Sequence, residues 1–306
     1  MVKLGMIGLS EGNGHPYSFS AILNGFNEEA FTKSGWPGIL KYLKKNNLPS
    51  NDKIDAKVEY IWTQDINLSK KIADSCYIPN IASHYLDFIG NIDAVIIARD
   101  DYKNHVKMAK EFLDYKIPVF IDKPLTLNFD ELCYFESYLK SGLLMSCSGF
   151  RYCEELDLWR SGISEFKNIK LLQATIINGW NKYGIHMIDA ILSLEYAWPE
   201  YFEPIKCASH EAVNITMSDG SLCQINALGP EIPTFSISIY GTNKHDKTQI
   251  TNNFIAFKRM LKKFIEQVDS GSPVISPNVT LLSIKSLIAG RMALDSGKPV
   301  YLDSLG

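Results

Sequence analysis

The first half of the chain alternates short apolar runs with stretches of helical periodicity, and no other feature of the sequence restricts the fold as strongly. The expected strands are Lys3–Gly8, Lys57–Trp62, Ile92–Ala98 and Val119–Ile121. The expected helices are Tyr17–Leu23, Trp36–Lys45, Asn67–Cys76 and His105–Asp114. Such alternation is typical of βαβ units, in which crossover helices join parallel strands. We therefore expect an α/β domain built on a parallel sheet.

The second half has strand-like runs in series, with few helices between them. The runs are Leu171–Ile177, Glu211–Met217, Ser221–Ala227 and Thr234–Tyr240, and the closing helices are Phe254–Val268 and Thr280–Leu294. Ser218-Asp219-Gly220 is a good hairpin turn. Apolar and polar residues alternate strictly in Phe235–Tyr240, which indicates a sheet with one packed face. The domains are therefore expected over residues 1–125 and 126–306.

The composition excludes several classes of protein. A chain of 306 residues with 46% apolar and 21% charged residues has ordinary globular composition and room for about two domains. Its 31 basic and 34 acidic side chains give a net charge of −3, which argues against a nucleic-acid partner. No apolar run approaches the ~18 residues of a membrane span, and no signal-peptide pattern is present. We therefore expect a cytoplasmic protein with no membrane partner.

The six cysteines form no C-x-x-C motif and no ligand-like cluster with histidine. Free thiols in a reducing compartment are therefore expected, and no metal site.

A glycine-rich turn follows the first expected strand and precedes a helix. Its sequence is Gly8-Leu9-Ser10-Glu11-Gly12-Asn13-Gly14. Glycines at such a turn let the backbone approach a diphosphate, and the helix N-terminus adds amide donors. The spacing is not G-x-G-x-x-G, because Ser10 stands where the second glycine is expected. An ordinary strand-to-helix turn remains the alternative.

The acidic residue that binds an adenosine ribose in NAD-binding domains is expected at the end of the second strand, about 20 residues after the glycines. In this chain the positions are Thr63, Gln64 and Asp65, and the extra length fits an insertion near residues 27–56. No arginine follows at once. The pattern therefore favours neither NAD nor NADP.

Several later segments carry a more specific pattern. Ile92–Ala98 is followed by His105, and Val119–Pro124 ends in Asp122-Lys123-Pro124. The other motifs are Gly149-Phe150-Arg151, Gly184-Ile185-His186-Met187-Ile188-Asp189 and Ser296-Gly297-Lys298-Pro299-Val300. In this order the segments resemble the glucose–fructose oxidoreductase/inositol dehydrogenase (Gfo/Idh/MocA) family. Asp122 replaces the glutamate of that family's E-K-P tripeptide. Gly149-Phe150-Arg151 resembles the family's strand that enters the second domain, and a helix is expected over Gly184–Ser193.

The resemblance implies an N-terminal Rossmann domain and a C-terminal α/β domain on a large open, mostly antiparallel sheet. The first domain would bind NAD or NADP, and the second would bind substrate and form the contacts of a homodimer or homotetramer. The implied reaction is hydride transfer between the nicotinamide and a hydroxyl or carbonyl carbon of a sugar, cyclitol or sugar nucleotide.

The resemblance also assigns candidate catalytic residues. Lys123 falls on the family's active-site lysine and His186 on its active-site histidine, with Asp189 as a local partner that orients His186. Lys182 stands where the family often has an aspartate, four residues before the histidine. We expect Lys182 to bind an anionic group of the substrate, with a neutral-lysine base or a solvent-exposed lysine as alternatives.

The residues expected to line the cofactor site lie in the turns that follow the expected strands. They are Gly8, Ser10, Gly12, Asn13, Gly14, Thr63, Asp65, Ala98, Arg99, His105 and Asp122. For His105 a structural role at the start of its helix is the alternative, and for Arg99 a solvated loop. The basic cluster around Lys258 is expected on the solvated face of an amphipathic helix.

Two further functions compete with net oxidation or reduction. One is a transient use of the cofactor, as in an epimerase, and the other is binding of a dinucleotide or sugar without turnover. The presence of Lys182 in place of an acid motivates the second alternative.

Overall fold

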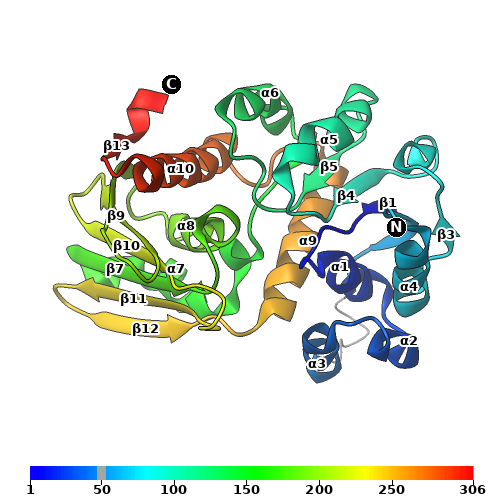
Figure 1. The fold of residues 1–306 in the computed structure, drawn as a ribbon, viewed down its shortest axis with the longest axis horizontal. Coiled ribbons are helices and arrows are strands. Elements are labelled where there is room, and N and C mark those ends of the chain that lie inside the picture. Colours follow the sequence, from blue (N-terminus) through cyan, green and yellow to red (C-terminus); the bar gives the residue numbers. More distant parts are fainter. Residues whose placement is uncertain (47–52, 306) are drawn as a thin grey trace. The chain divides into compact units, whose positions relative to one another are not determined.

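The computed structural model describes residues 1–46 and 53–305, which form two compact units (Figure 1). The first unit comprises Met1–Leu125, Tyr134–Cys147 and Phe257–Pro277. The second comprises Thr126–Cys133, Ser148–Ala256 and Asn278–Gly306. Two segments that follow residue 125 therefore return to the first unit, which the sequence pattern did not indicate.

The first unit is built on a six-stranded sheet, whose neighbouring strands pair in parallel. Its strands are β1 (Val2–Ile7), β2 (Ala56–Trp62), β3 (Asn80–Ile81), β4 (Ala94–Ile97), β5 (Val119–Ile121) and β6 (Leu144–Met145). The spatial order β3-β2-β1-β4-β5-β6 is that of a Rossmann fold. Strands β4 and β5 are fully buried, because helices cover both faces of a parallel sheet. The expected α/β fold is confirmed.

Helices α1 (His15–Asn24), α4 (Ile66–Cys76) and α5 (His105–Asp114) connect these strands. Helix α9 (Asn253–Ser270) joins the unit from Phe257 onward, and its Phe264 packs against Phe120 of β5 with ring centroids 5.6 Å apart. On the same helix Lys258 is only 6% exposed, so its expected place on a solvated face is wrong. Phe257 and Met260 are buried beside it.

The insertion after α1 contributes two helices, α2 (Glu28–Thr32) and α3 (Pro37–Lys45). Asn27 caps α2 by accepting from the Ala30 amide, and Pro37 opens α3 with its fixed φ. Residues 47–52 of the expected insertion lie outside the described part of the chain.

The second unit is built on a seven-stranded mixed sheet. Its strands are β7 (Ile169–Ile176), β8 (Pro199–Pro204), β9 (Glu211–Met217), β10 (Leu222–Ala227), β11 (Phe235–Gly241), β12 (His245–Gln249) and β13 (Val300–Tyr301). In the order β12-β11-β7-β10-β9-β8-β13, β7 pairs with β10 in parallel and the other neighbours are antiparallel. The expected hairpin joins β9 and β10, where Gly220 has φ +80°.

One face of this sheet is covered by α8 (Ile185–Leu192) and α10 (Pro277–Ser296) (Figure 1). Apolar side chains of α8 and the sheet, including Ile188 and Ile225, line a small cavity between these layers. Polar pairs project from the sheet elsewhere: Thr175 hydrogen bonds to Ser236 at 2.6 Å, and Gln173 to Gln224 at 3.0 Å. The alternation in β11 therefore reflects one apolar and one polar face, as expected.

Two local expectations need correction. Gly149-Phe150-Arg151, expected to be a strand, forms the 3₁₀ turn η4 (Gly149–Tyr152), because Ser148 caps it by accepting from the Phe150 amide at 3.1 Å. The helix expected from Gly184 begins at Ile185 and follows a π-helical turn, η7 (Trp180–Gly184). Among the described residues, no helix combines the length and the apolar character needed to span a bilayer.

Candidate active site

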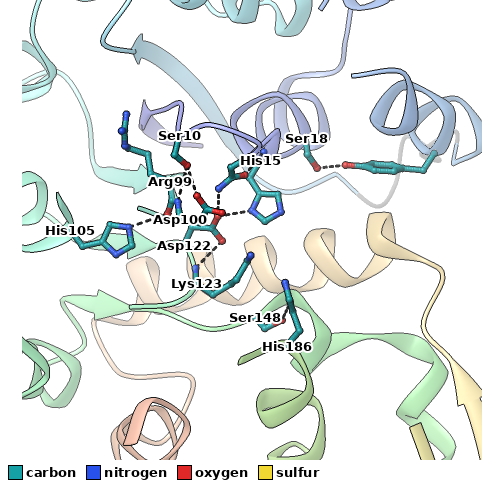
Figure 2. Close-up of polar contacts among 12 residues, drawn as sticks. Ser10, His15, Ser18, Arg99, Asp100, His105, Asp122, Lys123, Ser148 and His186 are labelled. Atoms are coloured by element: carbon teal, nitrogen blue, oxygen red, sulfur yellow. Dashed lines mark hydrogen bonds and ion pairs between the residues drawn. The ribbon is translucent and has the colours of Figure 1, made fainter. Parts of the chain in front are cut away.

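The strand order of the first sheet reverses between β1 and β4, and ligands of such sheets bind beyond the carboxyl ends of the strands at this point. The two strand ends are tied together, since the Ala98 amide donates to Ile7 O at 2.8 Å. Ser10 follows β1 and Asp100 follows β4 (Figure 2). The Ser10 hydroxyl donates to Asp100 Oδ1 at 2.7 Å, and the Asp100 amide donates to Ser10 Oγ at 3.1 Å. Ser10 therefore cross-links the loops on either side of the reversal.

The glycines of the glycine-rich turn differ in the space around the position of a Cβ atom. A Cβ at Gly8 would lie 2.5 Å from Pro16 Cγ, so β1 and α1 meet too closely for another residue. A Cβ at Gly14 would lie 2.6 Å from Ile39 Cδ1 and 2.7 Å from Trp36 Cε3. The inserted segment is therefore packed directly on the turn. Gly12, with φ +75°, has nothing within 4 Å of its Cβ position, which leaves open space beside the turn.

Asp122, directly after β5, is a carboxylate with three polar partners in this region (Figure 2). Its Oδ2 accepts from Asn13 Nδ2 at 2.9 Å and lies 2.6 Å from His15 Nδ1, while its Oδ1 accepts from the Lys123 amide at 2.9 Å. Burial raises the pKa of Asp122, but His15, Lys123 and Asn13 together outweigh that effect and leave the pKa below its ordinary value. Asp122 is therefore a buried, ionised carboxylate that orders the loop before α1.

His15 is a further functional candidate, beside the residues expected to line the cofactor site. It is the first residue of α1, and its ring stacks on Phe19 with centroids 4.8 Å apart and meets Phe257 edge-on at 4.9 Å. Two features of the sequence point to this contact. Asn13 and His15 stand at the start of a helix, and Asp122 replaces the glutamate of the related E-K-P tripeptide. The shorter Asp122 side chain leaves room for a histidine partner.

Arg99 joins the ends of three strands. Its Nη1 donates to Leu9 O at 3.0 Å and to Gln64 Oε1 at 2.9 Å, and its Nε and Nη2 donate to the two carboxylate oxygens of Asp101 at 2.8 and 2.6 Å. Burial raises the pKa of Asp101, but the hydrogen bonds from Arg99 and Asn104 lower it further, so the net shift is downward. Arg99 is 8% exposed, so it is not the solvated loop residue of the alternative interpretation.

The residues at the end of β2 are occupied by local contacts. The Thr63 hydroxyl donates to Asp65 O at 2.6 Å and lies 2.9 Å from Ser69 Oγ. Asp65 is the N-cap of α4, and its Oδ1 accepts from the Asn67 amide at 2.8 Å. Gln64 instead reaches across to β1, donating to Leu9 O at 2.8 Å. The structure thus brings Gln64 together with the glycine-rich turn and leaves Asp65 exposed on the rim.

His105 is fully buried at the start of α5. Its Nδ1 lies 2.9 Å from Leu125 O and its Nε2 lies 3.1 Å from Arg99 O. Burial lowers the pKa of His105, although both carbonyl contacts oppose that shift. Both ring nitrogens therefore face backbone, and the geometry assigns His105 to holding the loop after β4 against the segment that follows Lys123.

The second unit holds its own polar cluster around His186, on α8 (Figure 2). Ser148 Oγ lies 2.6 Å from His186 Nδ1, and the Ser148 amide donates to Asp189 Oδ2 at 2.6 Å. Asp189 Oδ1 accepts from Ser283 Oγ at 2.6 Å and lies 3.3 Å from Arg151 Nη2. Asp189 therefore reaches His186 through Ser148, a residue that the sequence interpretation missed although it precedes the Gly149-Phe150-Arg151 motif.

Lys182 lies in the π-helical turn before α8 and is exposed, whereas His186 is 5% exposed. A π turn contains an extra residue, so Lys182 and His186 do not keep the face-sharing i, i+4 relation of an α-helix. Lys123, the other catalytic candidate, is 5% exposed and follows Asp122 at the end of β5.

The chain matches known proteins in its fold. Residues 38–136 match the Gfo/Idh/MocA model, an oxidoreductase family with an NAD-binding Rossmann fold. No curated protein sequence matches the chain. Among the described residues, no group of three or more His, Cys, Asp or Glu side chains is arranged to hold a metal ion.

Solved structures align over nearly the whole chain. Myo-inositol 2-dehydrogenase from Lactobacillus plantarum has a TM-score of 0.77 at 15% identity, covering 98% of this chain and 99% of that one. Scyllo-inositol dehydrogenase from Lactobacillus casei, solved with NAD(H) and scyllo-inositol, has a TM-score of 0.77 at 14% identity and 99% coverage of both chains. GenD2 from gentamicin A biosynthesis, solved with NAD, has a TM-score of 0.75 at 11% identity, covering 98% and 96%.

These likenesses establish the fold, and the family match covers the strands β4 and β5 and the Asp122-Lys123-Pro124 tripeptide. They agree with the resemblance indicated by the sequence motifs: residues 38–136 match the NAD-binding Rossmann model of the Gfo/Idh/MocA oxidoreductase family.

Proposed function

We propose that the protein is an NAD-dependent dehydrogenase that oxidises a hydroxyl carbon of a cyclitol or sugar, or reduces the corresponding carbonyl. The observation that carries the proposal is the polar cluster at the strand-order reversal, where Ser10–Asp100 and Asn13–Asp122 order the loops beside Lys123. Relatives of the same fold are inositol dehydrogenases, which supports a polyhydroxylated ring as substrate.

The residues present fit a dinucleotide. The open space at Gly12 and the N-terminus of α1 suit a diphosphate, which binds at helix N-termini through amides and the helix dipole. Bound NAD supplies the hydride acceptor, and NADH the donor. Asp65 favours NAD, because its carboxylate at the end of β2 would repel a 2′-phosphate, and the guanidinium of Arg99 is already bound by Asp101.

Lys123 is the proposed partner of the reacting oxygen. Oxidation of an alcohol releases a proton along with the hydride, so a side chain that donates a hydrogen bond to the developing alkoxide lowers the barrier. The neighbouring Asp122 carboxylate is ionised and lies in the same turn. It favours the charged ammonium of Lys123, which suits the stabilisation of a developing alkoxide.

His186 is the proposed proton carrier of the second unit. Ser148 Oγ accepts from the Phe150 amide at 3.1 Å and still has a hydroxyl proton to donate. Because a hydroxyl both donates and accepts, Ser148 partners His186 Nδ1 in either tautomer. We therefore assign the transfer of the proton to the Nε2 atom of His186.

The test is turnover with purified protein. We expect NADH absorbance to appear when NAD is mixed with members of a panel of inositols, aldoses and sugar nucleotides, and to vanish in Lys123→Ala. Tightly retained cofactor with an isomerised product would support the epimerase alternative. Binding of NAD and of a panel member without any product would support the binding-protein alternative.

A further inference from the structure

A cluster of nucleophilic and basic side chains lies in the second unit on the loop between β8 and β9. Cys207 and His210 line an open hollow together with Lys206 and Glu211 of the same stretch and Arg291 of α10. None of these residues takes part in the sites described above.

The Cys207 thiol and the His210 imidazole are in direct contact. Cys207 Sγ lies 3.1 Å from His210 Nδ1, and Ser209 Oγ lies 3.3 Å from the sulfur and 3.0 Å from the same nitrogen. A thiol, a hydroxyl and a ring nitrogen thus form a closed triangle. In this arrangement Nδ1 can take the thiol proton while Ser209 donates to the resulting thiolate.

A third group fixes the tautomer of the histidine. His210 Nε2 lies 3.4 Å from Asn226 Oδ1, and Asn226 Nδ2 donates to Ala174 O at 3.4 Å. Because the amide nitrogen is held by a carbonyl, the amide oxygen faces the imidazole and accepts from Nε2–H. That leaves Nδ1 as the acceptor on the side of Cys207.

The hydrogen bonds to Cys207 act in the same direction. The hydrogen bonds from Ser209, aided by the backbone of Ser209 and His210, hold the pKa of Cys207 below its ordinary value. Lys206 lines the same hollow as Cys207 and can attract an anionic reactant, whereas Arg291 is paired with Glu211 and Asp295.

Three buried cysteines have raised rather than lowered pKa values. Burial raises the pKa of Cys153 to about 11 and of Cys223 to about 12, and it raises the pKa of Cys76 as well. Cys133 and Cys207 are the exposed thiols of the described chain, and Cys133 serves as an internal comparison.

We propose that Cys207, His210 and Asn226 form a reactive thiol site that undergoes exchange with small anionic disulfides. The thiol proton moves to His210 Nδ1, and the thiolate attacks one sulfur of the disulfide. A bond forms between Cys207 Sγ and that sulfur, the original S–S bond breaks, and one small thiolate leaves with its electron pair. The protein sulfur is oxidised to a mixed disulfide, and the departing thiol is reduced.

The test compares thiol reactivity in a Cys133→Ser background, which leaves Cys207 as the exposed thiol. We expect one fast release of thiolate from 5,5′-dithiobis(2-nitrobenzoate) per chain at neutral pH, and none after Cys207→Ser is added. His210→Gln should slow the reaction roughly 10-fold, because an ordinary thiol is only a few per cent ionised near neutrality. His245→Gln, another exposed histidine on β12, is the control and should change nothing.

Two further measurements test the charge preference of the site and the identity of the reacting thiol. Lys206→Gln should slow the anionic disulfide more than neutral 2,2′-dithiodipyridine, and intact-mass analysis after glutathione disulfide should place the adduct on Cys207. The proposal would be overturned if Cys207, measured in Cys133→Ser, reacted no faster than Cys133 measured in Cys207→Ser. A reaction rate of Cys207 that His210→Gln left unchanged would also overturn it.

Discussion

At the residue scale, the site depends on how a few buried charges are compensated. Asp122 is 1% exposed and keeps its ionised form because His15, Asn13 and the Lys123 amide all contact it. A buried charge that loses one partner is costly, since the remaining group stays desolvated. Asp122 is therefore expected to matter for stability as well as for the placement of Lys123.

Asp122→Asn should reduce the free energy of unfolding by about 2 kcal/mol at neutral pH. The pKa of Asp122 is lower in the folded state, so its ionised form contributes stability that is fully present above the unfolded value, near pH 4. That contribution is lost as the pH falls toward the folded value. Denaturant unfolding from neutral to acid pH should show the difference from wild type shrinking below about pH 4.

Asp114→Asn is the control for that experiment, because Asp114 is an exposed carboxylate paired with Lys110 on α5. It should leave the free energy of unfolding close to the wild-type value, because exposed ion pairs contribute little. An Asp122→Asn variant as stable as Asp114→Asn would contradict the role assigned to the buried carboxylate.

The catalytic assignments predict different kinetic signatures. Lys123→Ala should lower kcat by about 100-fold or more, because it removes a group that acts on the reacting oxygen.

Lys182→Ala should raise KM for an anionic substrate with little change in kcat, if this exposed lysine binds the substrate's charge. Steady-state kinetics with the substrate found by the panel measures both. Full activity in Lys123→Ala would refute its assignment.

Much of the site was accessible from the sequence, and the reason is local. Ser10, Asn13, Arg99 and Asp122 lie in the loops that follow strands, and parallel strands end at one edge of a sheet. Contacts between residues far apart in the chain gave no such signal: Ser148 lies 38 residues before His186 and meets it only after folding.

At the element scale, apolar periodicity located the buried strands and amphipathic helices. It found β4, α5 and β9 but missed β12, whose sequence His-Asp-Lys-Thr-Gln has no apolar residue. β12 is an edge strand, which pairs through its backbone and needs no buried side chain. The π-helical turn before α8 likewise has no signature in the sequence pattern.

The position of Ser148 at the start of the turn η4 leads to a prediction at this scale. Ser148→Ala should leave the fold intact but remove the partner of His186 Nδ1. We expect kcat to fall and the pH profile of kcat to shift, with KM nearly unchanged, because Ser148 orients His186 rather than touching substrate. Ser283→Ala is the comparison variant, because it removes a hydrogen bond to Asp189 but keeps the Ser148 hydroxyl. It shows how much of the effect comes from the contacts of Asp189 alone. An unshifted pH profile in Ser148→Ala would argue against the relay.

The packing of α3 on the glycine-rich turn gives a pair of glycine variants with opposite expected signs. Gly14→Ala should destabilise by roughly 1–3 kcal/mol, since its Cβ would enter the space of Trp36 and Ile39. Gly38→Ala, within α3, meets nothing within 4 Å and should stabilise by up to about 1 kcal/mol. Thermal unfolding with and without NAD measures both. Equal effects of the two changes would mean that α3 does not press on the turn.

At the scale of the whole molecule, the sheet of the second unit offers a surface for association. The sheet of the second unit has α8 and α10 on one face and a row of polar pairs elsewhere, with Tyr240 of β11 and Leu222 of β10 exposed at 42% and 37%. Exposed apolar groups among paired polar side chains are typical of a surface that another chain covers. A symmetric dimer would place the same strands of two chains against each other.

We therefore predict a homodimer or a homotetramer that forms through this sheet. Tyr240→Glu and Leu222→Lys place charges on the face, and the doubly substituted protein should elute and scatter light as a smaller species than wild type. Each charge would have to be desolvated without a partner, which costs several kcal/mol in an interface. Leu158→Lys provides the matched control, because Leu158 of α7 (Asp157–Gly162) is 83% exposed and lies outside the sheet. A wild-type protein that is monomeric at micromolar concentration would refute the prediction, and an oligomer unaffected by both changes would move the interface to another surface.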